Sequence, residues 1–174
     1  MRRDNRGLSM IEVIVVLAIM SVMAGAFTIG ISMALRKPAD ECASKLQSSL
    51  QSNRILAMGK IDTKLEIYMD AEGYIYLREI TETATSTGSD VKTTETLIGE
   101  KGITFEYELS DGNTASLLPG GSPLILSFDR SSGAFKDLTE MGFPNRYCKT
   151  ITISKSGLVK VLTMAYLTGK VTLE

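Results

Sequence analysis

The chain has 174 residues, a net charge of −1 and acidic and basic residues mixed along its length, a pattern that excludes the clustered lysine and arginine footprint of nucleic-acid-binding proteins. It contains no histidine, so the commonest general base and the commonest metal ligand are both missing. We therefore expect no enzymatic activity, no metal site and no cofactor, and the length leaves room for one folded domain after a hydrophobic N-terminal segment.

That N-terminal segment is long, apolar and preceded by basic residues. Arg2, Arg3 and Arg6 come first, and between residues 8 and 35 only Glu12 is charged. A helix of this length, at about 1.5 Å per residue, spans roughly 40 Å, enough to cross a bilayer core of about 30 Å. The arginines predict that the N-terminus stays in the cytoplasm and that the rest of the chain lies outside.

Three interpretations of this segment differ in where the mature chain begins. Ala24-Gly25-Ala26 fits the cleavage pattern of an ordinary signal peptide, which would give a secreted or membrane-anchored β-rich binding domain cut after Ala26. An uncleaved single-pass anchor accounts for the length equally well. Neither interpretation explains Glu12, because a carboxylate at the centre of a membrane helix costs about 2.5–3.5 kcal/mol, less near its edge, and marks a functional position.

The third interpretation uses the residues Gly7-Leu8-Ser9-Met10-Ile11-Glu12-Val13, which closely resemble the processing signal of type IV pilins and type II secretion pseudopilins. The resemblance implies that a prepilin peptidase cleaves after Gly7 and methylates the new amine of Leu8. It also implies that Glu12 serves assembly by meeting the N-terminal amine of a neighbouring subunit. Leu8 stands where the family usually has phenylalanine, and the proline that bends many pilin helices is missing before Pro38.

The same resemblance implies a function, a location and a set of partners. The expected function is that of a structural subunit, a minor pilin or pseudopilin, of a type IV pilus, a type II secretion pseudopilus or a competence pilus. Its expected partners are the prepilin peptidase, other pilin or pseudopilin subunits, and an inner-membrane assembly platform with its ATPase. The protein is expected in the cytoplasmic membrane as a single-pass precursor, and afterwards in the filament.

After the apolar run, small and apolar residues recur at three- and four-residue spacing through residues 39–57, interrupted by the polar Asn53. This spacing predicts an amphipathic helix over about residues 38–59. A proline restricts the residue before it and removes one helical hydrogen bond, so Pro38 predicts a kink or short break at residues 36–38.

Beyond the predicted helix, short segments of alternating polarity are separated by glycine-containing turns, which favour antiparallel hairpins. The predicted strands are residues 64–69, 74–80, 103–109, 124–128, 150–154, 158–164 and 170–173. The threonine-rich stretch Thr81 to Thr96 is too polar to build a core and is predicted to be an exposed, mobile loop, with contact to a partner as the alternative. Residues 119–123 predict a turn between strands.

Taken together, the pattern predicts an α+β protein in which a long N-terminal helix, half membrane-embedded and half amphipathic, packs on an antiparallel β-sheet. This architecture resembles that of the pilins. The predicted parts are a leader peptide at residues 1–7, a transmembrane and assembly helix at 8–35, an amphipathic helix at 36–60 and a globular sheet domain at 61–174. In two places, a strand followed by a glycine-containing turn resembles the pattern of H-type minor pseudopilins and related minor pilins. They lie within residues 124–133 and 151–159.

The two cysteines, Cys42 and Cys148, lack the CxxC spacing of zinc sites and redox motifs. Outside the cytoplasm they are free to form a disulfide, and otherwise they are two buried thiols. Sequence spacing leaves both alternatives open, because it does not give the Cα separation that a disulfide requires.

Three further acidic residues, Asp111, Glu106 and Glu108, are predicted to lie at the surface without a catalytic or metal-binding role. Asp111 and Asn113 carry oxygen ligands suited to calcium, yet Asp-Gly-Asn is foremost a turn sequence and the 12-residue loop of an EF-hand is missing. Glu106 and Glu108 alternate with apolar residues, so we predict that they form the solvated side of one strand.

Overall fold

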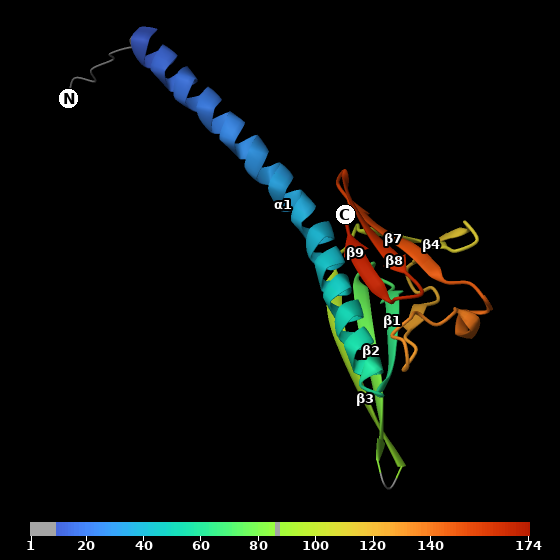
Figure 1. Cartoon of the computed structure of the whole chain (residues 1–174). Helices are drawn as coiled ribbons and strands as arrows, with labels where there is room; N and C mark the ends of the chain where they lie inside the picture. The colour runs from blue at the N-terminus through green and yellow to red at the C-terminus, as the bar shows by residue number, and fades with distance from the viewer. Residues whose placement is uncertain (1–9, 86–87) are drawn as a thin grey trace. The chain divides into compact units, whose positions relative to one another are not determined.

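A computed structural model describes the backbone of residues 10–85 and 88–174, and the side chains of residues 24–36, 84, 85 and 88 are not described. The chain divides into two compact units, Met1–Leu35 and Arg36–Glu174. The helix α1 (Met10–Met58) runs from the first unit into the second, and the strands of the described residues all belong to the second unit (Figure 1).

The described strands form two antiparallel sheets. Sheet A has the strand order β3-β2-β1-β6 and sheet B has the order β5-β4-β7-β8-β9. These strands, with a 3₁₀ turn between β6 and β7, are β1 (Asp62–Met69), β2 (Ile75–Thr85), β3 (Gly88–Gly99), β4 (Thr104–Leu109), β5 (Thr114–Ser116), β6 (Leu124–Ser127), η1 (Thr139–Met141), β7 (Cys148–Lys155), β8 (Leu158–Ala165) and β9 (Lys170–Leu173). The predicted α+β class, with an N-terminal helix and antiparallel strands, is confirmed.

The second half of α1 buries one face against both sheets. Its buried positions follow the predicted helical spacing, and they are Ala39, Cys42, Ala43, Leu46, Leu50, Asn53 and Ala57. The apolar ones share one core with the alternating inward side chains of the strands, such as Leu65 and Ile67 of β1 and Ile151 and Ile153 of β7. Burying a large apolar side chain contributes about 1.5–3 kcal/mol, so this face fixes the helix on the sheets.

The helix continues through Pro38, where we expected a kink or a short break, and its helical assignment is not interrupted there. Proline removes only its own N–H bond, and the turns on both sides supply the rest of the ladder. The helix ends where Lys60 adopts a left-handed conformation with φ of 67° and donates its N–H to the carbonyl of Ala57. The helix therefore ends at Met58, close to the predicted end at residue 59.

Asn53 is a polar residue on the buried face of α1, only 1% exposed. Its Nδ2 donates to the carbonyl of Ser49 and to Oε1 of Glu79 on β2, at 3.0 Å in each case. The Thr63 hydroxyl of β1 donates back to the Asn53 carbonyl at 3.3 Å. These directional bonds join the helix to two neighbouring strands, so they specify its position along the sheet in a way that apolar contact alone does not.

Leu46 offers a direct test of the helix packing, because its side chain is fully buried. The change Leu46→Ala is expected to lower the free energy of unfolding by about 2–5 kcal/mol, since it removes apolar contact and leaves a cavity. Urea unfolding of the full chain in detergent measures this loss. The exposed Ser48→Ala change is the matched control and is expected to stay within about 0.5 kcal/mol of the parent; an equal effect of both changes would contradict the packing.

We predicted a loop for the stretch Thr81 to Thr96, and this prediction is wrong. The stretch forms most of a β-ribbon made by β2 and β3. Strand β2 extends to Thr85 and pairs with β3 without a register shift from Tyr76 onward, for example Glu82 opposite Val91. Side chains 89–97 are all exposed, so the prediction that this stretch adds little core is correct. The prediction failed because it used polarity alone; threonine is β-branched and favours strands, and a hairpin satisfies its backbone hydrogen bonds without a core.

Short turns connect the remaining strands much as predicted. Ser156 and Gly157, the two residues between β7 and β8, both have positive φ, at 51° and 81°. Two such residues give the turn whose twist matches that of an antiparallel hairpin, which explains the glycine. Strand β5 was missed by the sequence prediction, because its three residues are too few to show a period of two.

Candidate functional site

The residues that the sequence singles out for function lie at the N-terminus. Gly7 and Leu8, the predicted cleavage and methylation positions, lie outside the described residues. Glu12 is described and occupies the first turn of α1, with an exposed side chain. A carboxylate is stabilised in this position by the partial positive charge of the helix N-terminus, about 0.3–1 kcal/mol at an exposed site.

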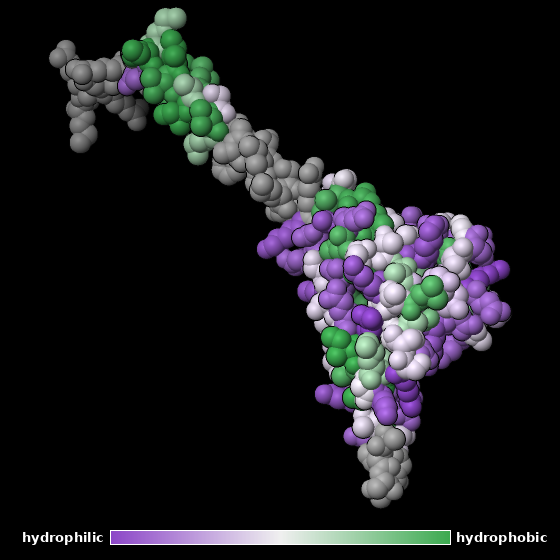
Figure 2. All heavy atoms as spheres, in the orientation of Figure 1, coloured by the Kyte–Doolittle hydropathy of each residue, from purple (hydrophilic) through white to green (hydrophobic). Residues whose placement is uncertain are grey.

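Around Glu12, the first part of α1 is apolar on every side. Large apolar side chains between 43% and 83% exposed surround the helix axis, and they are Met10, Ile11, Val13, Ile14, Val15, Val16, Leu17, Ile19, Met20, Val22 and Met23. Figure 2 shows these residues as a hydrophobic surface at the start of the helix. A helix that is hydrophobic all round normally lies inside a protein assembly or a membrane.

Within the described residues, no helix meets the length and hydropathy expected of a membrane span. The predicted span, residues 8–35, includes residues 8 and 9 and the side chains of residues 24–35, which lie outside the described part of the chain.

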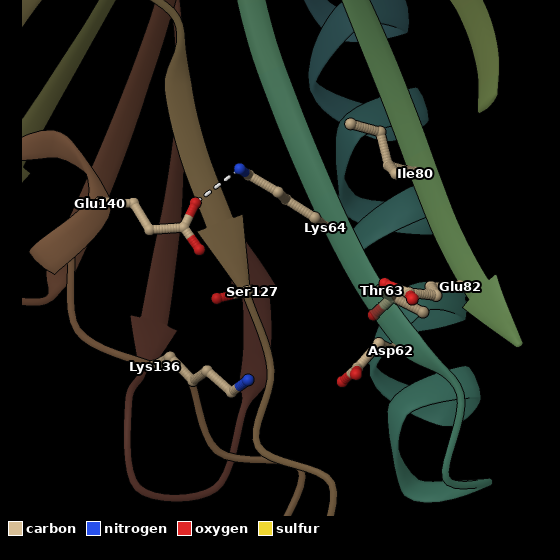
Figure 3. Close-up of a pocket in the computed structure, with 8 residues that line it drawn as sticks. All are labelled: Asp62, Thr63, Lys64, Ile80, Glu82, Ser127, Lys136 and Glu140. Carbon is tan, nitrogen blue, oxygen red and sulfur yellow. Dashed lines mark ion pairs between the residues drawn. The ribbon is translucent and has the colours of Figure 1, made fainter. Parts of the chain in front are cut away.

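In the second unit, a hollow of about 260 Å³ lies on the outer face of sheet A. Figure 3 shows its walls, with Lys136 on one side, Glu82 and Asp62 on the other, and Lys64 paired with Glu140 across one end. The Asp62 carboxylate is itself paired with Arg130. Lys64 and Asp62 are thus ion-paired at the surface, whereas among the described residues neither Lys136 nor Glu82 makes an ion pair.

Two further acidic residues, Glu108 and Asp129, have hydrogen-bonding partners within the domain. Glu106 and Glu108 lie on the outward side of β4, as predicted. Hydrogen bonds from Lys149 and Thr150 lower the pKa of the Glu108 carboxyl. Asp129 accepts hydrogen bonds from the backbone and hydroxyl groups of the two serines that follow Arg130, which holds the pKa of its carboxyl well below the usual range.

Asp111 behaves as a turn residue. Its carboxylate accepts hydrogen bonds from the backbone N–H and the side-chain amide of Asn113 and lies 3.0 Å from Nε of Arg146. An ion pair with arginine satisfies the carboxylate within the chain, which agrees with the turn predicted for this sequence.

Cys42 and Cys148 are free thiols in the structure, and both are buried. Cys42 projects from α1 into the core so close to Gly99 of sheet A that a methyl group on this glycine would lie 3.2 Å from the sulfur. Cys148 belongs to β7 of sheet B and its thiol contacts the Thr150 carbonyl. Burial raises the pKa of the Cys42 thiol to about 12 and raises the pKa of the Cys148 thiol as well.

Both thiols are expected to be unreactive until the protein unfolds, because the thiolate is the nucleophile. For Cys42, a pKa of about 12 predicts maleimide labelling near neutral pH on the order of 1,000-fold slower than that of an exposed thiol. Mass spectrometry of the full chain should find no label on the native protein and two labels after unfolding without reductant. Labelling that appears only after reduction would show a disulfide and contradict the prediction.

Comparison with known proteins concerns the N-terminal segment. Residues 2–28 match the family model of the prokaryotic N-terminal methylation motif, and no curated protein and no solved structure matches the chain. The matched residues contain Gly7, Leu8 and Glu12, in the segment that the sequence singled out. The motif implies a membrane-anchored pilus-type subunit that prepilin peptidase processes and that assembles with other pilins. Over residues 2–28, the chain therefore carries the prepilin-type N-terminal methylation motif of type IV pilins and pseudopilins.

Proposed function

We propose that this chain is a minor pilin or pseudopilin, a structural subunit of a type IV pilus, a type II secretion pseudopilus or a competence pilus. The observation that carries the proposal is the methylation motif over residues 2–28. The apolar start of α1 and the α+β domain that follows it support the same function. In this proposal the chain is the substrate of the processing enzyme and has a structural role of its own, since members of the family are generally structural.

Maturation would begin with cleavage of the peptide bond after Gly7. Hydrolysis of this bond releases the leader, residues 1–7, with a new carboxylate on Gly7, and leaves a new amine on Leu8. This amine would then take a methyl group from a methyl donor and lose one proton. A methylated amine keeps its positive charge, so the mature helix would begin with a cation. The arginines at positions 2, 3 and 6 would be removed with the leader, and the apolar helix would no longer carry its basic flank.

The new amine and the Glu12 carboxylate carry opposite charges. The two positions are four residues apart, about 6 Å along a helix axis at roughly 1.5 Å per residue. In an apolar environment a carboxylate is tolerated only when it is paired. We expect the pairing to join subunits, with Glu12 of one subunit meeting the Leu8 amine of the next, because such a contact neutralises both charges as the helices pack together in the filament.

Filament assembly in a reconstituted system tests this function. The full chain would be co-expressed with a prepilin peptidase, an assembly platform, its ATPase and a major pilin, and the sheared surface fraction would be probed for the chain. We expect the chain in the filament fraction only when the ATPase is active, and in the membrane when it is inactive. Release of a soluble domain regardless of the ATPase would contradict the proposal and favour a secreted binding domain.

A further inference from the structure

The β2–β3 ribbon, residues 75–85 and 88–99, is held to the domain only near its base. Ile75, Leu77 and Ile98 are buried there, whereas side chains 89–97 are exposed. Strand β3 is the edge of sheet A and pairs with β2 alone. Figure 1 shows the ribbon extending past the end of α1. Ordering such a ribbon costs chain entropy and buries little apolar surface, so the domain core does not account for it.

The ribbon presents two opposite charges on one side. Asp90 and Lys92 are two residues apart on β3, so their side chains project from the same face of the strand. Both are exposed. In the part of the chain that the structure describes, neither side chain takes part in an ion pair. The ribbon therefore carries an acid and a base that are both accessible to another molecule.

The hollow on sheet A carries the complementary charges. Lys136 and Glu82 lie on its two sides (Figure 3) and both side chains are exposed. Among the described residues, the hollow's other charged side chains are neutralised, Lys64 by Glu140 and Asp62 by its arginine, and neither Lys136 nor Glu82 makes an ion pair. An occupant that brings one carboxylate and one ammonium group would complete the set.

We propose that the β2–β3 ribbon of one subunit docks into this hollow on a second copy of the chain, with Asp90 meeting Lys136 and Lys92 meeting Glu82. The occupant is a second copy because Glu82 belongs to the same ribbon as Asp90 and Lys92, where it lies opposite Val91. A ribbon fixed in its own sheet cannot turn back onto that position. The inference rests on the proposed function, because the contact needs copies of the chain to enter the same filament.

The contact joins two different surfaces, the ribbon of one copy and the hollow of the next. Each copy can therefore insert its ribbon into one neighbour and accept the ribbon of another neighbour in its own hollow. Heterologous contacts of this kind extend into rings or filaments and do not close into a two-fold dimer. The charges also select the register, because reversing the docked pair would place Asp90 against Glu82 and Lys92 against Lys136. Like charges in these positions would oppose the wrong alignment.

Chemical cross-linking of assembled protein tests the contact. One full-length copy would carry Asp90→Cys, a differently tagged copy would carry Lys136→Cys, and a short bismaleimide would join thiols in the filament fraction. The native Cys42 and Cys148 are buried and serve as silent positions. We expect a cross-linked pair from the mixture and none from either variant alone. Cross-linking that is absent from the mixture, or equal in all three samples, would overturn the proposal.

Charge reversal gives a second readout. D90K and K136E are each expected to lower incorporation about threefold, as loss of an exposed ion pair implies, and a chain carrying both changes should recover. The matched control is K45E, which changes an exposed lysine on α1 outside the hollow. If incorporation of the double variant falls by the product of the two single losses, the proposed contact is wrong. If the parent chain is neither processed nor assembled, the proposed function fails instead, so the two failures are distinguishable.

Discussion

Replacing Glu12 by leucine is expected to abolish incorporation into filaments while leaving cleavage after Gly7 intact. The carboxylate lies in the first turn of α1, within a segment that is otherwise apolar on every side. If Glu12 neutralises the amine of a neighbouring subunit, the variant leaves that amine buried without a partner. Removing one member of a buried ion pair costs about 3–5 kcal/mol, which corresponds to a loss of incorporation of more than about 100-fold.

The measurement compares two fractions from the same cells. Intact mass of the membrane fraction reports cleavage, and the amount of chain in the sheared filament fraction reports assembly. Val13→Leu is the matched control, because it changes the adjacent residue but keeps the helix apolar and leaves the carboxylate in place. Normal incorporation of the Glu12→Leu variant would show that the carboxylate has no role in assembly.

A second large effect is expected at the cleavage position, where Gly7→Val should block processing. A residue without a side chain lets the backbone approach closely, and a β-branched side chain at the scissile bond moves that bond away from the catalytic groups of the peptidase. A displacement of about 1 Å costs on the order of 100-fold in rate. The uncleaved chain would keep its basic leader and accumulate in the membrane.

Processing can be followed by co-expression with an active prepilin peptidase and with an inactive variant of that enzyme. The Gly7→Val chain should have the same mass in both cases, whereas the parent chain should be shortened only by the active enzyme. Ser9→Ala, two residues beyond the glycine, is the control and should be cleaved normally. Cleavage of the Gly7→Val chain at the parental rate would show that the peptidase cuts at a different bond.

The sequence predicted most of the fold because its periodicities are local. The three- and four-residue spacing around Leu46 and Leu50 predicted a helix that the structure confirms, and alternation in segments such as 64–69 predicted strands. The β2–β3 ribbon differs from the predicted loop because threonine is both polar and β-branched, and its preference for strands outweighs its polarity here. The strands there form by pairing of β2 with β3, and β2 also pairs with β1 as far as Glu82, contacts that the polarity of the residues does not show.

The sequence alone could locate the N-terminal motif but not the hollow on sheet A. The N-terminal motif is linear, so Gly7, Leu8 and Glu12 could be singled out from their spacing alone. The hollow on sheet A combines positions such as Glu82 and Lys136, which are far apart in the chain and meet only through sheet pairing and the segment after β6. No spacing rule would have joined them, and only their accessible charges, seen after folding, indicate a role.

The position of the mature N-terminus is the measurement that tests the proposed processing and function most directly. N-terminal sequencing and intact mass would be obtained for the chain isolated from membranes and filaments of cells with an active prepilin peptidase. Cleavage after Gly7 predicts a first residue of Leu8 carrying one added methyl group, which retains Glu12 in the mature helix. A first residue of Phe27, which would discard Glu12 with a signal peptide, or an intact start at Met1 would contradict it.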